Sequence, residues 1–260
     1  MESVERRDFM IKPYFETENG KLYHGDCLEI MKIIPDKSID MILCDLPYGT
    51  TACFWDVVIP FEPLWVQYKR IVKDNAAIVL TGSQPFTTSI IMSNQKWFKY
   101  CLVWDKQRSC GSMLAKCRPL KYHEDIIIFC KTQTIYNPQM VRGPKQKKAS
   151  GGHSENYGEI SLLRYESSLY YPRSILEFKA CHNMTGKDHP TQKPVDLFRY
   201  LILTYTNPGA TILDNCIGSG TTASSAESIN RKWIGIEKDE NYCRKAAKRI
   251  RAETRQLTIT

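Results

Sequence analysis

A short group of residues, Asp45-Leu46-Pro47-Tyr48, has the chemistry to hold an amino group. The group follows an apolar run at 38–44 that is typical of a buried strand. A carboxylate at the end of such a strand can accept one hydrogen of an amine, while a neighbouring backbone carbonyl accepts the other. Tyr48 offers a flat face on which a base taken out of its helix can stack. The competing interpretation is a turn aspartate beside a core tyrosine, because Asp and Pro are common turn residues.

A glycine-rich turn later in the chain has the pattern of a nucleoside-binding loop. Gly218 and Gly220 lie between an apolar run at 211–214 and a helical pattern, and Glu237 ends the next apolar run. Glycines at such a turn let the backbone approach a ligand, and an acid at the tip of the following strand can accept hydrogen bonds from both ribose hydroxyls. Ala223 is the nearest small residue to a third glycine, and no Gly-Lys-Ser/Thr sequence follows. These departures disfavour a dinucleotide dehydrogenase and a P-loop, and leave an ordinary tight turn as the alternative.

Short apolar runs alternate with helical patterns along most of the chain, and these elements must position both groups. Strands are predicted at 38–45, 76–80, 101–104, 126–130, 211–214 and 233–237, and helices at 61–73, 85–94, 221–230 and 240–253. Continuous apolar strands that alternate with helices indicate a mostly parallel sheet covered on both faces. The predicted fold is therefore α/β, with a doubly wound sheet.

Residues 132–180 break this pattern. They contain Gly143-Pro144, Gly151-Gly152 and many Ser and Tyr residues, and their apolar periodicity is poor. The segment also carries a basic cluster, formed by Arg142, Lys145, Lys147 and Lys148. We interpret it as an inserted variable region or a long functional loop whose cations contact phosphates, with a plain solvated loop as the alternative.

Composition and charge narrow the class of protein. The 260 residues are 42% hydrophobic and carry a net charge of +8, which suits a packed core and a polyanionic partner without requiring that partner. No stretch approaches the roughly 20 apolar residues of a membrane span, and no apolar signal-peptide core follows Met1. We therefore expect a cytoplasmic protein without membrane contact. The ten cysteines form no C-x-x-C pair, so we expect neither a disulfide framework nor a bound metal.

In type and order, these motifs resemble those of the β group of DNA amino-methyltransferases, which modify adenine N6 or cytosine N4. Asp45 to Tyr48 is similar to the family's D-P-P-Y motif, and Asp214 to Thr222 is similar to its cofactor loop, D-P-F-x-G-x-G-T-T. His24 to Cys27 resembles the family's entry segment, and His189 to Pro194 resembles the segment that precedes the cofactor loop. The catalytic motif comes first, as in the β group, and the match excludes only about 132–180 and both ends.

Two departures from the family pattern affect the expected roles. Leu46 replaces the usual first proline, which is tolerable because that position is expected to contribute its backbone carbonyl. Asn215-Cys216 replace proline and phenylalanine in the cofactor loop, which alters the packing around the cofactor but leaves the glycines intact.

The resemblance implies a Rossmann-like methyltransferase with an inserted target-recognition region. It implies a catalytic part at 1–131, a target-recognition insert at 132–180, and a cofactor-binding part of the same domain at 181–260. The implied reaction moves a methyl group from S-adenosyl-L-methionine to N6 of an adenine flipped out of double-stranded DNA. A homodimer and a functionally paired restriction endonuclease are both compatible with this reading.

The resemblance also assigns residues. The catalytic group is Asp45, Leu46, Pro47 and Tyr48. The cofactor is expected to contact Asp26, Cys27, Thr191, Lys193, Asp214, Cys216, Gly218, Ser219, Gly220, Thr221, Thr222 and Glu237. Within these, Glu237 should hold the ribose, and Thr191 and Lys193 should lie near the methionine carboxylate. DNA phosphates are expected at Arg142, Lys145, Lys147 and Lys148, and at a second, more dispersed set that includes Arg108, Lys116, Arg118 and Lys121.

Other functions stay open at this point. Cytosine N4, RNA or a protein glutamine amide could replace adenine as the methyl acceptor, although an acid at position 45 favours adenine. A degenerate relative that only binds DNA is the remaining alternative. It is disfavoured because a protein that merely binds has no physical need for the Asp45 carboxylate.

Overall fold

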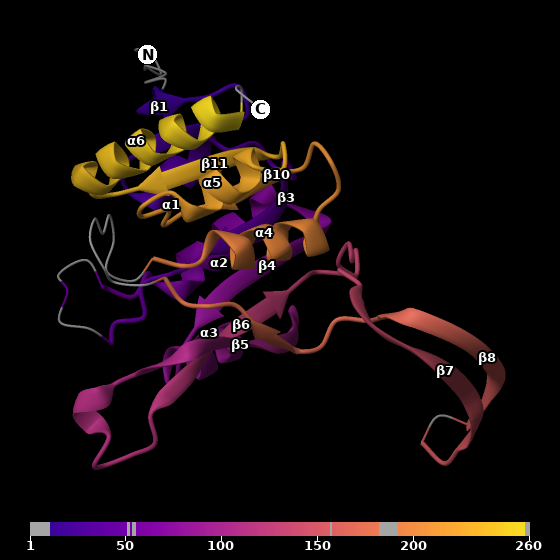
Figure 1. Cartoon of the computed structure of the whole chain (residues 1–260). Coiled ribbons are helices and arrows are strands. Elements are labelled where there is room, and N and C mark those ends of the chain that lie inside the picture. Colours follow the sequence, from indigo (N-terminus) through magenta and orange to yellow (C-terminus); the bar gives the residue numbers. More distant parts are fainter. Residues whose placement is uncertain (1–10, 51–52, 54–55, 157, 182–191, 258–260) are drawn as a thin grey trace, which may run out of the picture.

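A nine-stranded sheet forms the centre of the protein, in the order β1-β2-β11-β10-β3-β4-β6-β5-β9 (Figure 1). The computed structural model describes residues 11–50, 53, 56–156, 158–181 and 192–257. The strands are β1 (Phe15–Glu16), β2 (Gly20–His24), β3 (Ile39–Cys44), β4 (Val72–Gly82), β5 (Phe98–Cys110), β6 (Lys121–Phe129), β9 (Ile175–Glu177), β10 (Thr211–Asp214) and β11 (Lys232–Glu237). Neighbouring strands from β2 to β4 are parallel, as predicted, and β6 pairs antiparallel with β4 and β5.

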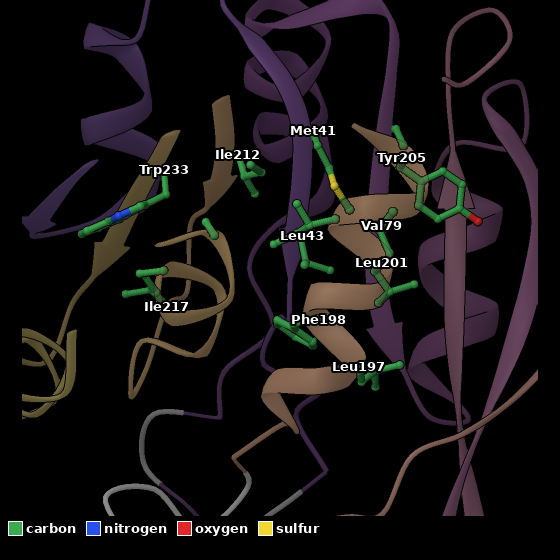
Figure 2. Packing of buried hydrophobic residues seen from close by; sticks show 14 of the residues in the cluster. Met41, Leu43, Val79, Leu197, Phe198, Leu201, Tyr205, Ile212, Ile217 and Trp233 are labelled. Atoms are coloured by element: carbon green, nitrogen blue, oxygen red, sulfur yellow. The ribbon is translucent and has the colours of Figure 1, made fainter. Parts of the chain in front are cut away.

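Helices cover both faces of the sheet, and the alternation of side chains along β3 shows why. Met41 and Leu43 point into one hydrophobic cluster, and Ile42 and Cys44 point into the other. The first cluster is covered by α4 (Val195–Tyr205), α5 (Thr221–Glu227) and α6 (Glu240–Leu257), and Figure 2 shows α4 side chains lying over β3 and β4. The second is covered by α1 (Cys27–Ile30), α2 (Phe61–Ile71) and α3 (Phe86–Ser93). The short helix η1 (Met31–Ile33) follows α1, and η2 (Ser112–Leu114) lies in the turn between β5 and β6. The predicted doubly wound α/β fold is therefore confirmed.

The chain leaves β3 and β10 in opposite directions. From β3 it crosses to β4 on one side, and from β10 it crosses to β11 on the other. Because β3 and β10 are adjacent and parallel, their carboxyl ends flank the point where the winding of the sheet reverses. Such points are where open α/β sheets bind ligands. Asp45 follows β3 there, and the glycine-rich loop follows β10.

Residues 132–180 form a separate two-stranded ribbon and one strand of the main sheet. The ribbon consists of β7 (Val141–Ser154) and β8 (Gly158–Tyr170), which pair antiparallel and extend away from the body (Figure 1). β9 then pairs with β5, so the segment ends inside the main sheet. Because β6 runs antiparallel to β4, its end at Phe129 lies beside Ile78, and the chain then continues toward the amino end of β4, where the Thr132 N–H donates to the Asp74 carbonyl. The ribbon therefore leaves the sheet at the edge opposite Asp45.

Among the described residues, no helix has the length and apolar character that a membrane crossing requires.

Candidate active site

The Asp45 carboxylate collects side chains from three separate parts of the chain. Tyr48 donates its hydroxyl hydrogen to Oδ1 over 2.7 Å, and Thr81 near the end of β4 donates to the same oxygen. Lys193, just before α4, donates to Oδ2 over 2.6 Å. The structure thus brings together Asp45, Tyr48 and Lys193, which are 148 residues apart at the extremes. It places Lys193 against the catalytic motif, where the sequence suggested only a position near the cofactor carboxylate.

The Tyr48 ring is held face to face with a second aromatic side chain. Its centroid lies 4.9 Å from that of Phe86, with an interplanar angle of 28°. Phe61 contacts the edge of Phe86 at 5.9 Å, which holds Phe86 in place. Phe86 therefore covers one face of the Tyr48 ring, and Lys193 Nζ lies over the ring at 5.7 Å from its centroid. Burial and the neighbouring Asp45 charge raise the pKa of Tyr48 well above its usual range, so its hydroxyl remains a donor.

Leu46 contributes to the core through its side chain. The side chain is buried in the cluster beneath β3 and β4. The apolar residue at this position therefore fits the fold, and the site can use only the backbone of Leu46.

Two buried charges next to Lys193 were missed from the sequence. Lys193 Nζ lies 3.3 Å from Glu124 Oε2, and Lys106 Nζ lies 3.1 Å from Glu124 Oε1. Glu124 thus bridges two lysines, and the chain of ion pairs runs Asp45–Lys193–Glu124–Lys106. Trp104 lies directly opposite Glu124 across β5 and β6, and Lys106 is its diagonal neighbour on the same face. A charge beside an apolar run was the only sequence signal available.

The two carboxylates decide the charge of Lys193. Burial alone would lower its pKa, but the nearby charges of Asp45 and Glu124 overcome this effect and raise the pKa above its usual value. Lys193 is therefore a fixed cation at physiological pH. Glu124 Oε2 is buried and makes no hydrogen bond within the described structure, since its contact with Lys193 is an ion pair of poor hydrogen-bond geometry.

The glycine-rich loop is shaped by Glu237. Gly218 and Gly220 have φ angles of 53° and 84°, which few other residues adopt. Glu237 accepts the backbone N–H of Gly218 on Oε2 over 2.9 Å and that of Asp239 on Oε1 over 2.8 Å. Each carboxylate oxygen keeps acceptor capacity for a ribose hydroxyl. The donor set at the end of β11 therefore fits a nucleoside cofactor.

Other predicted cofactor residues lie in the glycine-rich loop or beside the end of β11. Asp214 is buried and accepts hydrogen bonds from the Thr222 hydroxyl at 2.5 Å and the Cys216 amide at 3.1 Å. Asp26 caps α1 through the Leu28 amide at 2.9 Å. Ser219 and Thr221 are buried, with Arg249 of α6 against both. Thr191 falls outside the described residues.

Cys27, Cys44 and Cys216 lie close together at the glycine-rich loop, and all three are free thiols. The hydrogen bond of Cys27 with Cys216, together with burial, raises the pKa of Cys27 far above its usual range. Burial also raises the pKa of Cys44 to about 12. These thiols stay protonated and act as small apolar groups. In the part of the chain that the structure describes, no three His, Cys, Asp or Glu side chains are grouped to hold a metal ion.

Burial of Asp214 gives the protein a specific pH dependence. Loss of solvent raises the pKa of Asp214 from 3.8 to about 6, although the bonds from Thr222 and Cys216 oppose the shift. Between these two values the folded state binds more protons than the unfolded state, so the free energy of unfolding falls as pH rises. We expect Asp214 to contribute a loss of up to about 3 kcal/mol from pH 4 to pH 6 and little change above. Urea unfolding at several pH values measures this slope, which should flatten in Asp214→Asn; an unchanged slope would contradict the assignment.

The predicted DNA contacts lie at two opposite edges of the sheet. Arg142 and Lys145 are exposed on the ribbon, where Lys145 pairs with Glu166 at 2.8 Å. Lys147 and Lys148 also lie on β7. The other set, Arg108 and Arg118, is exposed around the turn between β5 and β6, at the Asp45 edge. The structure therefore does not bring the two sets together.

Residues 39–248 match the model of a family described as DNA methylase. The type II methyltransferase M2.LlaDCHI of Lactococcus lactis subsp. cremoris is 28% identical, with 93% of both chains covered. The DNA adenine methyltransferase YhdJ of Escherichia coli strain K12 is 27% identical, with 91% of this chain and 84% of the relative covered.

Solved structures show the same fold. The M1.HpyAVI–SAM complex has a TM-score of 0.63 and 24% identity, covering 89% of this chain and 98% of the other. The PvuII DNA methyltransferase, described as cytosine-N4-specific, has a TM-score of 0.65 and 18% identity, covering 96% of both chains. Because the family model matches most of this chain, the chain belongs to the N6/N4 DNA methylase family and is an S-adenosyl-L-methionine-dependent DNA methyltransferase.

Proposed function

We propose that this enzyme methylates N6 of adenine in double-stranded DNA, and that Asp45, the Leu46 carbonyl and Tyr48 hold the flipped base. The observation that carries the proposal is the Asp45 carboxylate at the end of β3, fixed by Tyr48, Thr81 and Lys193. The adenine specificity named for the relative YhdJ agrees with it. A likeness in fold to a cytosine-N4 enzyme at 18% identity does not favour the other base.

The chemical difficulty is the weak nucleophilicity of the amine. Its lone pair is delocalised into the purine ring, so the nitrogen is nearly planar. Hydrogen bonds from the two amino hydrogens to the Asp45 carboxylate and the Leu46 carbonyl draw the nitrogen toward tetrahedral geometry. The lone pair then projects out of the ring plane. Most of the acceleration comes from this positioning, and no covalent bond to the protein is needed.

Asp45 acts as an acceptor in this scheme. Its charge is matched by Lys193, and its Oδ1 already receives two hydroxyl hydrogens. The amine can share Oδ2 with Lys193, since a carboxylate oxygen accepts more than one hydrogen bond. The proton released after methyl transfer is strongly acidic and does not require a strong base. Tyr48 stacks on the base with the face turned away from Phe86, which offsets part of the few kcal/mol that flipping costs.

The cofactor's place follows from the residues at the ends of β10 and β11. Glu237 would hold the ribose, Asp26 would lie toward the adenine end, and Gly218 to Thr222 would surround the methionine portion. When bound, S-adenosyl-L-methionine supplies a methyl group on an electron-poor sulfur. The loop follows β10 and Asp45 follows the adjacent β3, so the two sites meet at the reversal point of the sheet.

Basic residues of two regions would fix the duplex by its phosphates. Arg108 and Arg118 serve the Asp45 edge, and Arg142, Lys145, Lys147 and Lys148 on the ribbon serve a more distant part of the DNA. The relative M2.LlaDCHI is named a type II methyltransferase. The proposal therefore includes modification, in the cytoplasm, of the DNA sites that a paired endonuclease would cut.

Identification of the methylated base tests the proposal. The purified enzyme is incubated with tritiated S-adenosyl-L-methionine and genomic duplex DNA that lacks methylated bases, and the DNA is digested to nucleosides. We expect the label in N6-methyladenine. Label in N4-methylcytosine would overturn the choice of base, and the absence of label from DNA, while the cofactor still binds, would overturn DNA as the substrate. Mapping the labelled fragments then yields the recognition sequence.

A further inference from the structure

The turn between β5 and β6, residues 111–120, stands directly beside the proposed base site. Its last paired residues are Cys110 and Lys121. Lys121 contacts the Ser83 hydroxyl, two residues beyond Thr81, which donates to Asp45. On the other strand, the chain of ion pairs described above joins Lys106 to Asp45. The turn therefore rises from the wall of the site, and Figure 1 shows it extending from the body beside β5 and β6, apart from the ribbon.

The charge of this region suits a nucleic-acid backbone. Residues 106–123 contain five Lys and Arg and no Asp or Glu. Arg108, Lys116 and Arg118 are exposed, Lys121 is half-buried, and Lys106 is buried against Glu124. The ribbon, residues 141–170, also has five basic residues, but they are offset by three glutamates. No Asp or Glu in 106–123 offsets Arg108, Lys116 and Arg118, and of the two regions this one lies at the edge where the base must enter.

Met113 lies in this turn and is almost completely exposed. It belongs to the short 3-10 helix η2, which follows Gly111 with its φ of 80°. The exposed fraction of Met113 is 96%. The side chain gains nothing for folding in this place, since it buries almost no apolar area. An isolated exposed methionine is unremarkable elsewhere. What distinguishes Met113 is its position beside the proposed base site, in a turn that carries exposed cations.

We propose that Met113 enters the duplex and occupies the space that the flipped target base leaves, while Arg108 and Arg118 hold the flanking phosphates. The proposal rests on the proposed methylation of a flipped base in duplex DNA. Removal of a base from the stack leaves an apolar gap, and unbranched or bulky apolar side chains, methionine among them, are inserted between bases in other complexes. The flexible, polarisable thioether suits such a gap. Filling the gap stabilises the flipped state without any contact to the reacting amine.

The test uses a duplex of the mapped recognition sequence with 2-aminopurine at the target position, whose fluorescence rises when it leaves the stack. We expect Met113→Ala to reduce the fluorescence rise by at least about fivefold and to slow single-turnover methylation of the natural duplex by a similar factor. Binding of S-adenosyl-L-methionine should stay as in the wild type. Met113→Leu should retain most of both signals. The matched control is Met92→Ala on α3, where the methionine is 61% exposed, and it should behave as the wild type.

A weakened duplex separates a gap-filling role from a structural one. With the target base opposite an abasic site, little pairing opposes flipping, so methylation by Met113→Ala should recover to near the wild-type rate. The proposal is overturned if Met113→Ala flips and methylates the natural duplex normally, or if its defect is equally large on the weakened duplex. If the wild type methylates no DNA at all, the proposed function fails, and this outcome is distinct from failure of the Met113 assignment.

Discussion

Replacement of Asp45 by asparagine should reduce kcat for methyl transfer by at least about 10³-fold, or roughly 4 kcal/mol. The amide presents one carbonyl oxygen where the carboxylate has two acceptors, and its NH₂ group cannot accept from the base or from Lys193. The amine then lacks the hydrogen bond that draws its nitrogen out of the ring plane. Lys193, which is buried, also loses one of its two counter-charges.

The measurement is single-turnover methylation with saturating cofactor, beside the dissociation constant for S-adenosyl-L-methionine from calorimetry. Affinity for the cofactor should change by less than about threefold, because Glu237 and the glycine-rich loop are untouched. Asp40→Asn is the matched control, since Asp40 lies on the same strand and pairs with Lys73 at the other end. Activity of Asp45→Asn within tenfold of the wild type would remove Asp45 from the chemistry.

Replacement of Glu124 by glutamine should destabilise the protein by about 3 kcal/mol, because two buried ammonium groups lose a shared partner. The side chains of Lys106 and Lys193 are 7% and 8% exposed, so water cannot substitute for the missing charge. Urea unfolding measures the loss. The double variant Lys106→Met/Glu124→Gln removes one charge of each sign and should recover most of it. If the losses in unfolding free energy of Lys106→Met and Glu124→Gln simply add in the double variant, the two charges are not coupled.

The single variant Glu124→Gln should also change the pH dependence of activity. Glu124 is one of the two charges that raise the pKa of Lys193 against the opposing effect of burial. Without it, Lys193 loses its proton at lower pH, and the alkaline limb of the kcat profile should move toward neutrality. Tyr48, Lys106 and Lys121 also lie near this group, but they are unchanged in the variant. Glu124→Asp should restore the limb in part, and a profile identical to the wild type would exclude this role for Glu124.

Local patterns were sufficient to predict six strands of the main sheet and the two motifs, but they missed β1, β2 and β9. The apolar run at 211–214 coincides with β10, and the helix predicted from 240 is α6, although it continues to Leu257. The predicted strand at 101–104 is only the centre of β5, because the polar ends of that strand lack apolar alternation. The placement of Asp45 and Glu237 at strand ends could be predicted because strand ends are visible in the sequence as changes in polarity.

Contacts between distant strands were not visible in this way. The pairing of β5 with β6 sets Glu124 beside Lys106, and the antiparallel course of β6 decides which turn lies at the Asp45 edge. Both depend on strand order, which a single sequence does not encode in its local pattern. The same limit applies to Lys193, whose partner in the described structure is 148 residues away.

The position of β10 between β11 and β3 has a consequence for how the protein is made. β3 ends at Cys44, but the strand that covers its open side begins only at Thr211. During synthesis, at about 5–20 residues per second, the edge of β3 stays without its native partner for roughly ten to thirty seconds. Such an apolar edge is a template for pairing with other chains. Nascent chains interrupted before Thr211 should therefore need a chaperone to stay unaggregated, whereas those extended past β11 can close the sheet on their own.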